Sequence, residues 1–181
     1  FGVYQAFFAA PSFNGNIIDP PAPAPEFTLD SDHGAVKLAD FQGKYILLYF
    51  GYSYCPDVCP STLSDMKRVV NALDPQSTRL QGIYVSVDPR RDTPDRMGEF
   101  SRFYHPSFIG LSGSMDAISQ TASAYGIVFR YNDAESTTNY TVEHTSMITL
   151  IDPQGRIRVH WDHGTTSEEM ISDLRQLMRE D

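Results

Sequence analysis

The amino-acid sequence predicts one α/β domain in which a central β-sheet carries helices on its faces and a β-hairpin stands at the start. Two patterns predict this class. Short, nearly continuous apolar runs, typical of strands buried on both faces, alternate with longer segments whose apolar residues recur at helical spacing. The chain has 181 residues, enough for a domain with a full hydrophobic core, so its stability requires no disulfide.

The expected elements follow one another as hairpin, strand, helix, strand, helix, strand, helix, strand, two paired strands and helix. The hairpin is expected in FTLDSDHGAVKLADF, where a glycine-containing turn separates two half-apolar runs. The segments expected as strands after it are KYILLYF, LQGIYVSVD, SFIGLSG, GIVFRY, SMITLID and RIRVHW. Helical spacing marks the residues after the cysteines up to Leu73, DTPDRMGEFSRFY, Met115 to Tyr125, and TTSEEM onward.

Two of the expected helices begin with a recognisable signal. Asp92 and Thr93 stand before Pro94, an order typical of a helix start. At the last helix, Thr166 and Glu169 have capping-box spacing, in which each side chain accepts a hydrogen bond from the other residue's backbone N–H. These signals indicate where the second and the last helix begin.

We expect the folded domain to cover residues 26–181 and residues 1–25 to form a tail and spacer. DPPAPAPEF is rich in proline and alanine, which predicts an extended spacer. FGVYQAFFAA is apolar but too short to span a membrane, and we interpret it as the remainder of an upstream segment that was cut away. Within the domain, YNDAESTTNY is expected to be a surface loop or hairpin tip.

The composition is that of a globular, acidic protein. Hydrophobic residues make up 41% of the chain and charged residues 20%, and the net charge is −9. No basic cluster of the kind that nucleic-acid-binding proteins carry is visible in the sequence. The charge therefore does not favour a nucleic-acid partner.

The only two cysteines of the chain, Cys55 and Cys59, lie four residues apart in FGYSYCPDVCPSTL. They follow an expected strand and precede an expected helix, so both thiols should lie near a helix N-terminus. Unpaired backbone N–H groups there lower the pKa of a thiol. Thiolate is the form that attacks disulfides and binds soft metals, so a redox pair and a metal site are both open. Two inert buried thiols are the third alternative, which the flanking prolines disfavour.

A strand, paired cysteines and a helix resemble the thioredoxin arrangement, but three residues rather than two separate the cysteines here. This spacing permits a disulfide, and it also suits two thiolates that bind one ion. Two ligands are too few for a structural zinc site, whereas Cu(I) accepts fewer and softer ligands.

Five histidines are available to complete a site: His33, His105, His144, His160 and His163. We expect His33 and His105 to be solvated turn residues, and His160 and His163 to mark a strand end and a turn. His144 stands just before the expected strand SMITLID. In thioredoxin-like folds the loop entering that strand lies against the cysteine loop. We therefore select His144, against the alternative of a polar residue at a strand mouth.

Four motifs, YFGYSYCPDVCPSTLSDM, VSVDPRRDTPDRM, GLSGSMDAISQTASAYGI and YTVEHTSMITLIDPQGRI, resemble the Sco family, also called SenC or PrrC. These are membrane-tethered copper-binding proteins that serve assembly of the copper centre of cytochrome c oxidase. The resemblance covers the chain from about Glu26 to the final helix. It implies a thioredoxin-like fold with a central mixed β-sheet, and a copper ion, Cu(I) or Cu(II), bound by Cys55, Cys59 and His144.

The resemblance also implies partners and a location. The main expected partner is the copper-receiving subunit of cytochrome c oxidase, and a copper donor protein or a thioredoxin-like reductant are further expected partners. The family's N-terminal anchor implies the extracytoplasmic face of a membrane. We expect a bacterial cell envelope rather than the mitochondrial inner membrane.

Three functions are weighed on this basis. The first is a copper-binding assembly factor, a metallochaperone. The second is a thiol–disulfide oxidoreductase in which Cys55 and Cys59 form a redox-active pair that reduces the cysteines of a copper-receiving partner. The third is a thiol peroxidase, for which the sequence identifies no activating pocket. His144 separates the first two, since disulfide exchange does not need that ligand.

Four further residues near these motifs have competing interpretations. Asp88 is either a carboxylate near the cysteine loop that orients or docks another group, or a residue that merely ends a strand before Pro89. Neither interpretation is favoured. Asp57 is expected to cap the helix after the cysteines, and the alternative is a charge near the metal. Met66 and Met147 carry soft sulfur atoms and lie near the cysteine and histidine motifs in the sequence. Their positions on a helix and a strand favour packing in the core instead.

Overall fold

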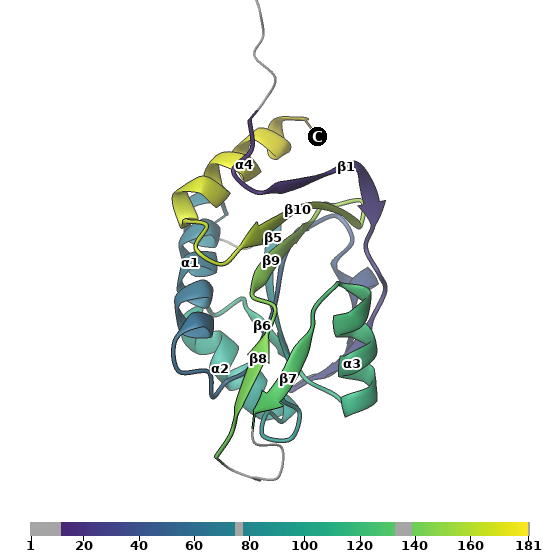
Figure 1. Cartoon of the computed structure of the whole chain (residues 1–181). Coiled ribbons are helices and arrows are strands. Elements are labelled where there is room, and N and C mark those ends of the chain that lie inside the picture. Colours follow the sequence, from purple (N-terminus) through teal and green to yellow (C-terminus); the bar gives the residue numbers. More distant parts are fainter. Residues whose placement is uncertain (1–11, 75–77, 133–138, 181) are drawn as a thin grey trace, which may run out of the picture.

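The computed structural model describes residues 12–74, 78–132 and 139–180, and its centre is a six-stranded mixed sheet of order β1-β10-β9-β4-β5-β6 (Figure 1). Strands β4, β5 and β6 are parallel, and β9, β10 and β1 continue the sheet in antiparallel pairs. The strands are β1 (Asn16–Pro23), β2 (Thr28–Ser31), β3 (Gly34–Lys37), β4 (Tyr45–Gly51), β5 (Leu80–Ser86), β6 (Ile109–Leu111), β7 (Phe129–Asn132), β8 (Thr141–His144), β9 (Met147–Ile151) and β10 (Arg156–Asp162).

Helices cover both faces of this sheet. They are α1 (Val58–Leu73), α2 (Pro94–Tyr104), α3 (Met115–Ala124) and α4 (Ser167–Glu180), with a 3₁₀ turn η1 (Leu38–Phe41) after the first hairpin. Figure 1 shows α1 and α4 along one side of the sheet and α3 on the other. Because β4 and β5 lie between helices and between neighbouring strands, every one of their residues is buried, which explains their unbroken apolar sequence.

From the first hairpin onward the elements follow the predicted order, with β8 as an additional strand, and the predicted start signals of α2 and α4 are present. β2 and β3 form the predicted hairpin. The Thr93 side chain accepts a hydrogen bond from the backbone N–H of Arg96 at the start of α2. At α4, Thr166 N donates to Glu169 Oε2 at 2.8 Å and Glu169 N donates to Thr166 Oγ1 at 3.3 Å, so the capping box is present.

The predicted spacer before Glu26 is corrected by the structure. Residues Asn16–Pro23 form β1, which pairs with β10 as an edge strand of the main sheet. Ala24, directly after it, is only 8% exposed. The proline-rich composition was misleading because proline lacks a backbone donor and is tolerated in a sheet only at an edge or a bulge. Strand β1 has both features, since its register shifts between Ile17 and Ala22.

The β7–β8 hairpin stands apart from the main sheet. Within the described part of the chain it pairs with no other strand, so it forms a two-stranded sheet of its own. Its register places Phe129 opposite His144. The strand predicted in GIVFRY begins only at Phe129 and is shorter than expected. Most of the predicted polar tip, residues 133–138, lies outside the described residues.

No helix among the described residues has the length and apolar content needed to cross a bilayer. The apolar stretch of residues 1–10, interpreted above as the remainder of a removed segment, lies outside the described residues.

Candidate metal centre

The structure brings Cys55, Cys59 and His144 together, as the sequence predicted. The two Sγ atoms and a ring nitrogen of His144 all lie within 4.8 Å of one another. The distance from Cys59 Sγ to His144 Nε2 is 3.5 Å. The cysteines lie between the end of β4 and the first turn of α1, and His144 ends β8, so two segments 85 residues apart in sequence build the cluster.

The cysteine loop places one sulfur over the start of α1. The backbone N–H of Cys55 donates to the Tyr52 carbonyl at 3.2 Å, which closes a turn. The backbone N–H of Cys59, a first-turn donor without an intrahelical partner, donates to Cys55 Sγ at 3.4 Å. Asp57 occupies the N-cap position, but its side chain makes no cap hydrogen bond, so the capping role predicted for it is wrong.

The two thiols differ in burial and in acidity. Cys59 is fully buried, whereas Cys55 is partly exposed. A hydrogen bond from the Cys59 thiol lowers the pKa of Cys55 to about 3, helped by the backbone N–H groups of Asp57 and Cys59 against the cost of burial. The same hydrogen bond and burial raise the pKa of Cys59. The site therefore stabilises one thiolate, at Cys55, with Cys59 as its proton-bearing neighbour.

A hydrogen bond to a backbone carbonyl orients the imidazole. His144 Nδ1 lies 3.1 Å from the carbonyl oxygen of Thr145. A carbonyl oxygen only accepts, so Nδ1 carries the proton in the neutral ring and Nε2 keeps its lone pair. That lone pair lies on the side of the ring that approaches Cys59. A ring fixed in this way is a competent ligand, because metal-binding histidines usually donate their other N–H to such an acceptor.

Three tyrosines that the sequence analysis missed surround the cluster. Tyr49 Oη lies 3.6 Å from Cys59 Sγ and 3.1 Å from Ser146 Oγ. The Tyr49 ring stacks on Tyr84 with centroids 5.6 Å apart, and the Tyr52 ring meets the imidazole edge-on. Burial raises the pKa of Tyr49, so its hydroxyl stays protonated beside the sulfur.

Gly51 makes the close approach of these groups possible. A Cβ at this position would lie 2.7 Å from Cys59 Sγ and 2.8 Å from Tyr84 Oη. The alternation of β4 puts Tyr49 and Gly51 on the same face of the strand, and this was a signal in the sequence. The partner Tyr84 needed the register of β4 against β5, which the sequence alone does not supply.

The remaining histidines lie elsewhere. In the described residues the only cluster of metal-binding side chains is Cys55, Cys59 and His144. His33 and His163 are exposed, as expected, and His160 is hydrogen-bonded to Thr149 at 3.0 Å. The prediction for His105 is wrong: it is only 6% exposed and packs against Phe108.

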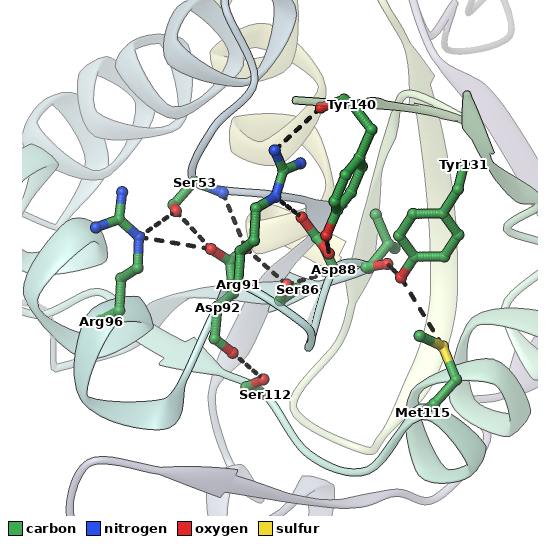
Figure 2. Close-up of polar contacts among 11 residues, drawn as sticks. Ser53, Ser86, Asp88, Arg91, Asp92, Arg96, Ser112, Met115, Tyr131 and Tyr140 are labelled. Carbon is green, nitrogen blue, oxygen red and sulfur yellow. Dashed lines mark hydrogen bonds and ion pairs between the residues drawn. The ribbon is translucent and has the colours of Figure 1, made fainter. Parts of the chain in front are cut away.

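The other residues weighed from the sequence are also placed. Met66 is fully buried, and Met147 packs at the edge of the core, as predicted. Asp88 is fully buried and takes part in a network with Arg91 and Tyr140, shown in Figure 2. Asp88 is therefore more than a plain strand-end residue, because its carboxylate binds Arg91 and Tyr140.

The comparison with family models decides the family. The model described as SCO1/SenC matches residues 17–179. The chain belongs to the SCO1/SenC family.

Relatives of this SCO1/SenC chain occur in animals and bacteria. It is 32% identical over 156 residues to the mitochondrial SCO2 homolog of Bos taurus, covering 84% of this chain and 59% of that protein. It is 37% identical over 134 residues to a putative copper-binding protein of Stutzerimonas stutzeri, covering 73% of this chain and 65% of that protein. The chain thus spans between half and two thirds of the length of these two relatives.

Solved SCO1/SenC structures confirm the predicted thioredoxin-like fold. The apo Sco1 protein of Thermus thermophilus aligns with a TM-score of 0.84 at 35% identity, over 93% of this chain and 99% of that one. The Bradyrhizobium japonicum ScoI structure with copper bound aligns with a TM-score of 0.76 at 33% identity, over 86% of this chain and 99% of that one.

Proposed function

We propose that this protein is a copper-binding assembly factor for the copper centre of cytochrome c oxidase, with Cys55, Cys59 and His144 as the copper ligands. One observation carries the proposal: two thiols and one imidazole converge within 4.8 Å of one another from two distant segments. The copper-bound ScoI structure of Bradyrhizobium japonicum, a relative at 33% identity, supports the identity of the metal.

The donor set fits copper as a cargo. Thiolate sulfur suits Cu(I), and imidazole suits both oxidation states, so the mixed set can hold either. Cys55 is poised as a thiolate, and metal binding would take the remaining proton from Cys59. With three protein donors and a partly exposed Cys55, an incoming ligand from a partner has access to the metal.

The partners and location follow from this role. The receiver would be the copper-receiving subunit of the oxidase, with a copper donor protein or a thioredoxin-like reductant acting before it. Because the proposed receiver belongs to a membrane enzyme, we propose that this protein acts at the extracytoplasmic face of the same membrane. An N-terminal anchor would hold it there. Relatives named mitochondrial and relatives from bacteria both occur, and we propose a bacterial cell envelope for this chain.

The second candidate is a thiol–disulfide oxidoreductase, which the asymmetry of the two thiols favours. Cys55 thiolate would attack one sulfur of a partner disulfide, forming a mixed disulfide as the partner's other sulfur leaves as thiolate. Cys59 would then attack Cys55 Sγ, giving up its proton and releasing the second partner thiolate. The partner gains two electrons, and the chain ends with a Cys55–Cys59 disulfide.

A transfer experiment with the receiver domain of cytochrome c oxidase separates the two roles. In one arm, the Cu(I)-loaded protein is mixed with the reduced receiver, and copper on each protein is measured after separation. In the other arm, the copper-free reduced protein is mixed with the oxidised receiver, and free thiols are counted by mass spectrometry. An assembly factor moves copper in the first arm. Thiol transfer in the second arm without copper transfer in the first would instead support the oxidoreductase.

A further inference from the structure

The turn after β5, residues 88–92, lies between the two segments that build the metal centre. Backbone hydrogen bonds from Arg91 N and Asp92 N to the Asp88 carbonyl, at 3.1 and 2.9 Å, close it into a single tight turn. Asp88 and Asp92 are both fully buried. Asp88, Arg91 and Asp92 are not members of the cluster of Cys55, Cys59 and His144. The proposed copper function therefore does not explain why these charged side chains lie here.

One end of the turn holds the cysteine loop. Asp92 Oδ2 accepts from the backbone N–H of Ser53 at 2.9 Å and from Ser86 Oγ at 2.7 Å. Ser53 Oγ donates to Asp92 Oδ1 at 2.5 Å and accepts from Arg96 Nε at 2.6 Å (Figure 2). Ser53 stands two residues before Cys55, so these bonds set the position from which the cysteine loop departs.

The other end holds the hairpin that carries the histidine. Tyr140 Oη donates to Asp88 Oδ1 at 2.7 Å, and Arg91 donates to Asp88 Oδ2 at 2.5 Å and to the Tyr140 carbonyl at 3.0 Å. The Arg91 guanidinium also lies 3.7 Å from the centre of the Tyr140 ring. Tyr131, on the paired strand, donates to the Val87 carbonyl at 2.8 Å (Figure 2).

These contacts matter because the β7–β8 hairpin has no backbone pairing with the main sheet in the described residues. Its position beside the cysteine loop depends on side chains, on the short link from His144 to β9 and on the short connection from α3 to β7. Tyr140 directly precedes β8, and His144 ends it. A displacement at Tyr140 is therefore carried along four strand residues to the imidazole.

We propose that the turn 88–92 is a positioning element for the metal centre, in which Asp92 holds the cysteine loop, and Asp88 with Arg91 holds the His144 hairpin. Both arms share one rigid turn, so the distance between the thiol pair and the imidazole is set by it. The proposal rests on the proposed copper function for its main readout. Asp88, Arg91, Asp92 and Tyr140 are positioning residues and touch no metal.

The test compares Tyr140→Phe with a matched control, Tyr125→Phe. Each variant removes one tyrosine hydroxyl that donates at 2.7 Å, to Asp88 in the first case and to the Pro25 carbonyl in the second. Tyr140→Phe should weaken Cu(II) binding about tenfold relative to Cu(I), the scale at which loss of a group supporting a ligand acts. It should also shift the thiolate-to-Cu(II) absorption band. Tyr125→Phe should change neither.

Two further variants check that the effect runs through the turn. Asp88→Asn keeps the size of the side chain but weakens its pairing with Arg91, and its effect on the Cu(II)-to-Cu(I) ratio should not add to that of Tyr140→Phe. Ser53→Ala loosens the cysteine arm and should weaken Cu(I) and Cu(II) binding alike. Additive effects, or equal ratios in Tyr140→Phe and Tyr125→Phe, would overturn the proposal.

A copper-free readout separates this proposal from the proposed function. The ring-nitrogen NMR resonances of His144 should shift in apo Tyr140→Phe and not in apo Tyr125→Phe. If the parent takes up no copper, the proposed function fails and these resonances alone decide the positioning role. Unchanged His144 resonances in Tyr140→Phe would contradict it.

Discussion

At the scale of single residues, Cys55 and Cys59 have the same chemistry but opposite environments. Cys55 Sγ accepts hydrogen bonds from backbone N–H groups at the start of α1 and from the S–H group of Cys59, and each donor stabilises negative charge on its sulfur. Cys59 is buried against Tyr49 and Gly51, where a charge would be costly. One thiolate beside one protonated thiol suits metal binding and thiol exchange equally. The thiols alone therefore do not separate the two functions.

The acidity of Cys55 can be measured by alkylation. With a pKa of about 3, Cys55 is already thiolate at pH 5, where an ordinary cysteine, with a pKa of about 8.5, is protonated. Iodoacetamide should therefore modify Cys55 at pH 5 at nearly its pH 7 rate, and leave buried Cys59 unmodified, as judged by peptide mass spectrometry. Cys59→Ala removes the largest cause of the shift, so the pKa of Cys55 should rise and alkylation at pH 5 should slow. A parent rate that grows tenfold per pH unit up to pH 8 would refute this assignment.

His144 is the residue at which the candidate functions diverge. His144→Ala should keep the fold and weaken Cu(II) binding by at least roughly tenfold, because Cu(II) depends more on nitrogen donors than Cu(I) does. The thiolate-to-Cu(II) absorption should shift or vanish. Disulfide exchange should change much less, since the Cys59 hydrogen bond that contributes most to the acidity of Cys55 remains.

The control for His144→Ala is His163→Ala, at an exposed histidine outside the cluster, which should leave copper binding unchanged. If His144→Ala binds Cu(II) like the parent with an unchanged spectrum, the three-ligand site is wrong. The oxidoreductase would then be the stronger candidate.

At the scale of elements, strand β1 is attached to the domain by more than its pairing with β10. Asp173 on α4 is 1% exposed and accepts from the backbone N–H of Gly15 at 2.9 Å and from Trp161 Nε1 at 2.8 Å. It also accepts from Asn14 N at 2.9 Å. One carboxylate thus joins the entry to β1, the end of β10 and the last helix.

Asp173→Ala should destabilise the fold by about 3 kcal/mol, because it leaves several buried donors without an acceptor. Urea unfolding followed by circular dichroism measures this loss. The matched control is Glu168→Ala, an exposed carboxylate on the same helix, which should change the free energy of unfolding by less than about 0.5 kcal/mol. Copper stoichiometry should be unchanged in both variants. An Asp173→Ala protein as stable as Glu168→Ala would show that the entry to β1 contributes little to stability.

The elements also show what the sequence could and could not predict. The buried strands and helix starts were predictable because apolar periodicity and capping signals are local. Strand β1 was missed because its prolines argue against a strand. They are tolerated here because β1 is an edge strand, which the sequence does not reveal. His105 was misplaced because a position at a helix end does not reveal burial, and its side chain is 6% exposed and packs against Phe108.

At the scale of the whole molecule, the cluster of Cys55, Cys59 and His144 forms where the carboxyl end of β4 meets a hairpin outside the main sheet. That Cys55, Cys59 and His144 lie together could be predicted because the thioredoxin arrangement specifies which loops meet. Tyr84 and the turn 88–92 could not, since they depend on strand register and on long-range hydrogen bonds. Asp88 illustrates this limit: its role became visible only with Tyr140, 52 residues away in sequence.

The central claim, a copper site built on reduced Cys55 and Cys59, is tested most directly by an anaerobic copper titration of the reduced and the oxidised protein. The oxidised sample is the monomer whose mass has fallen by two hydrogens, which marks an intramolecular disulfide. The reduced protein should bind one Cu(I) per chain against a competing chelator, and the oxidised protein should bind none tightly, because a disulfide offers no thiolate. Undiminished binding by the oxidised protein, or a reduced protein that takes up no copper, would contradict the account.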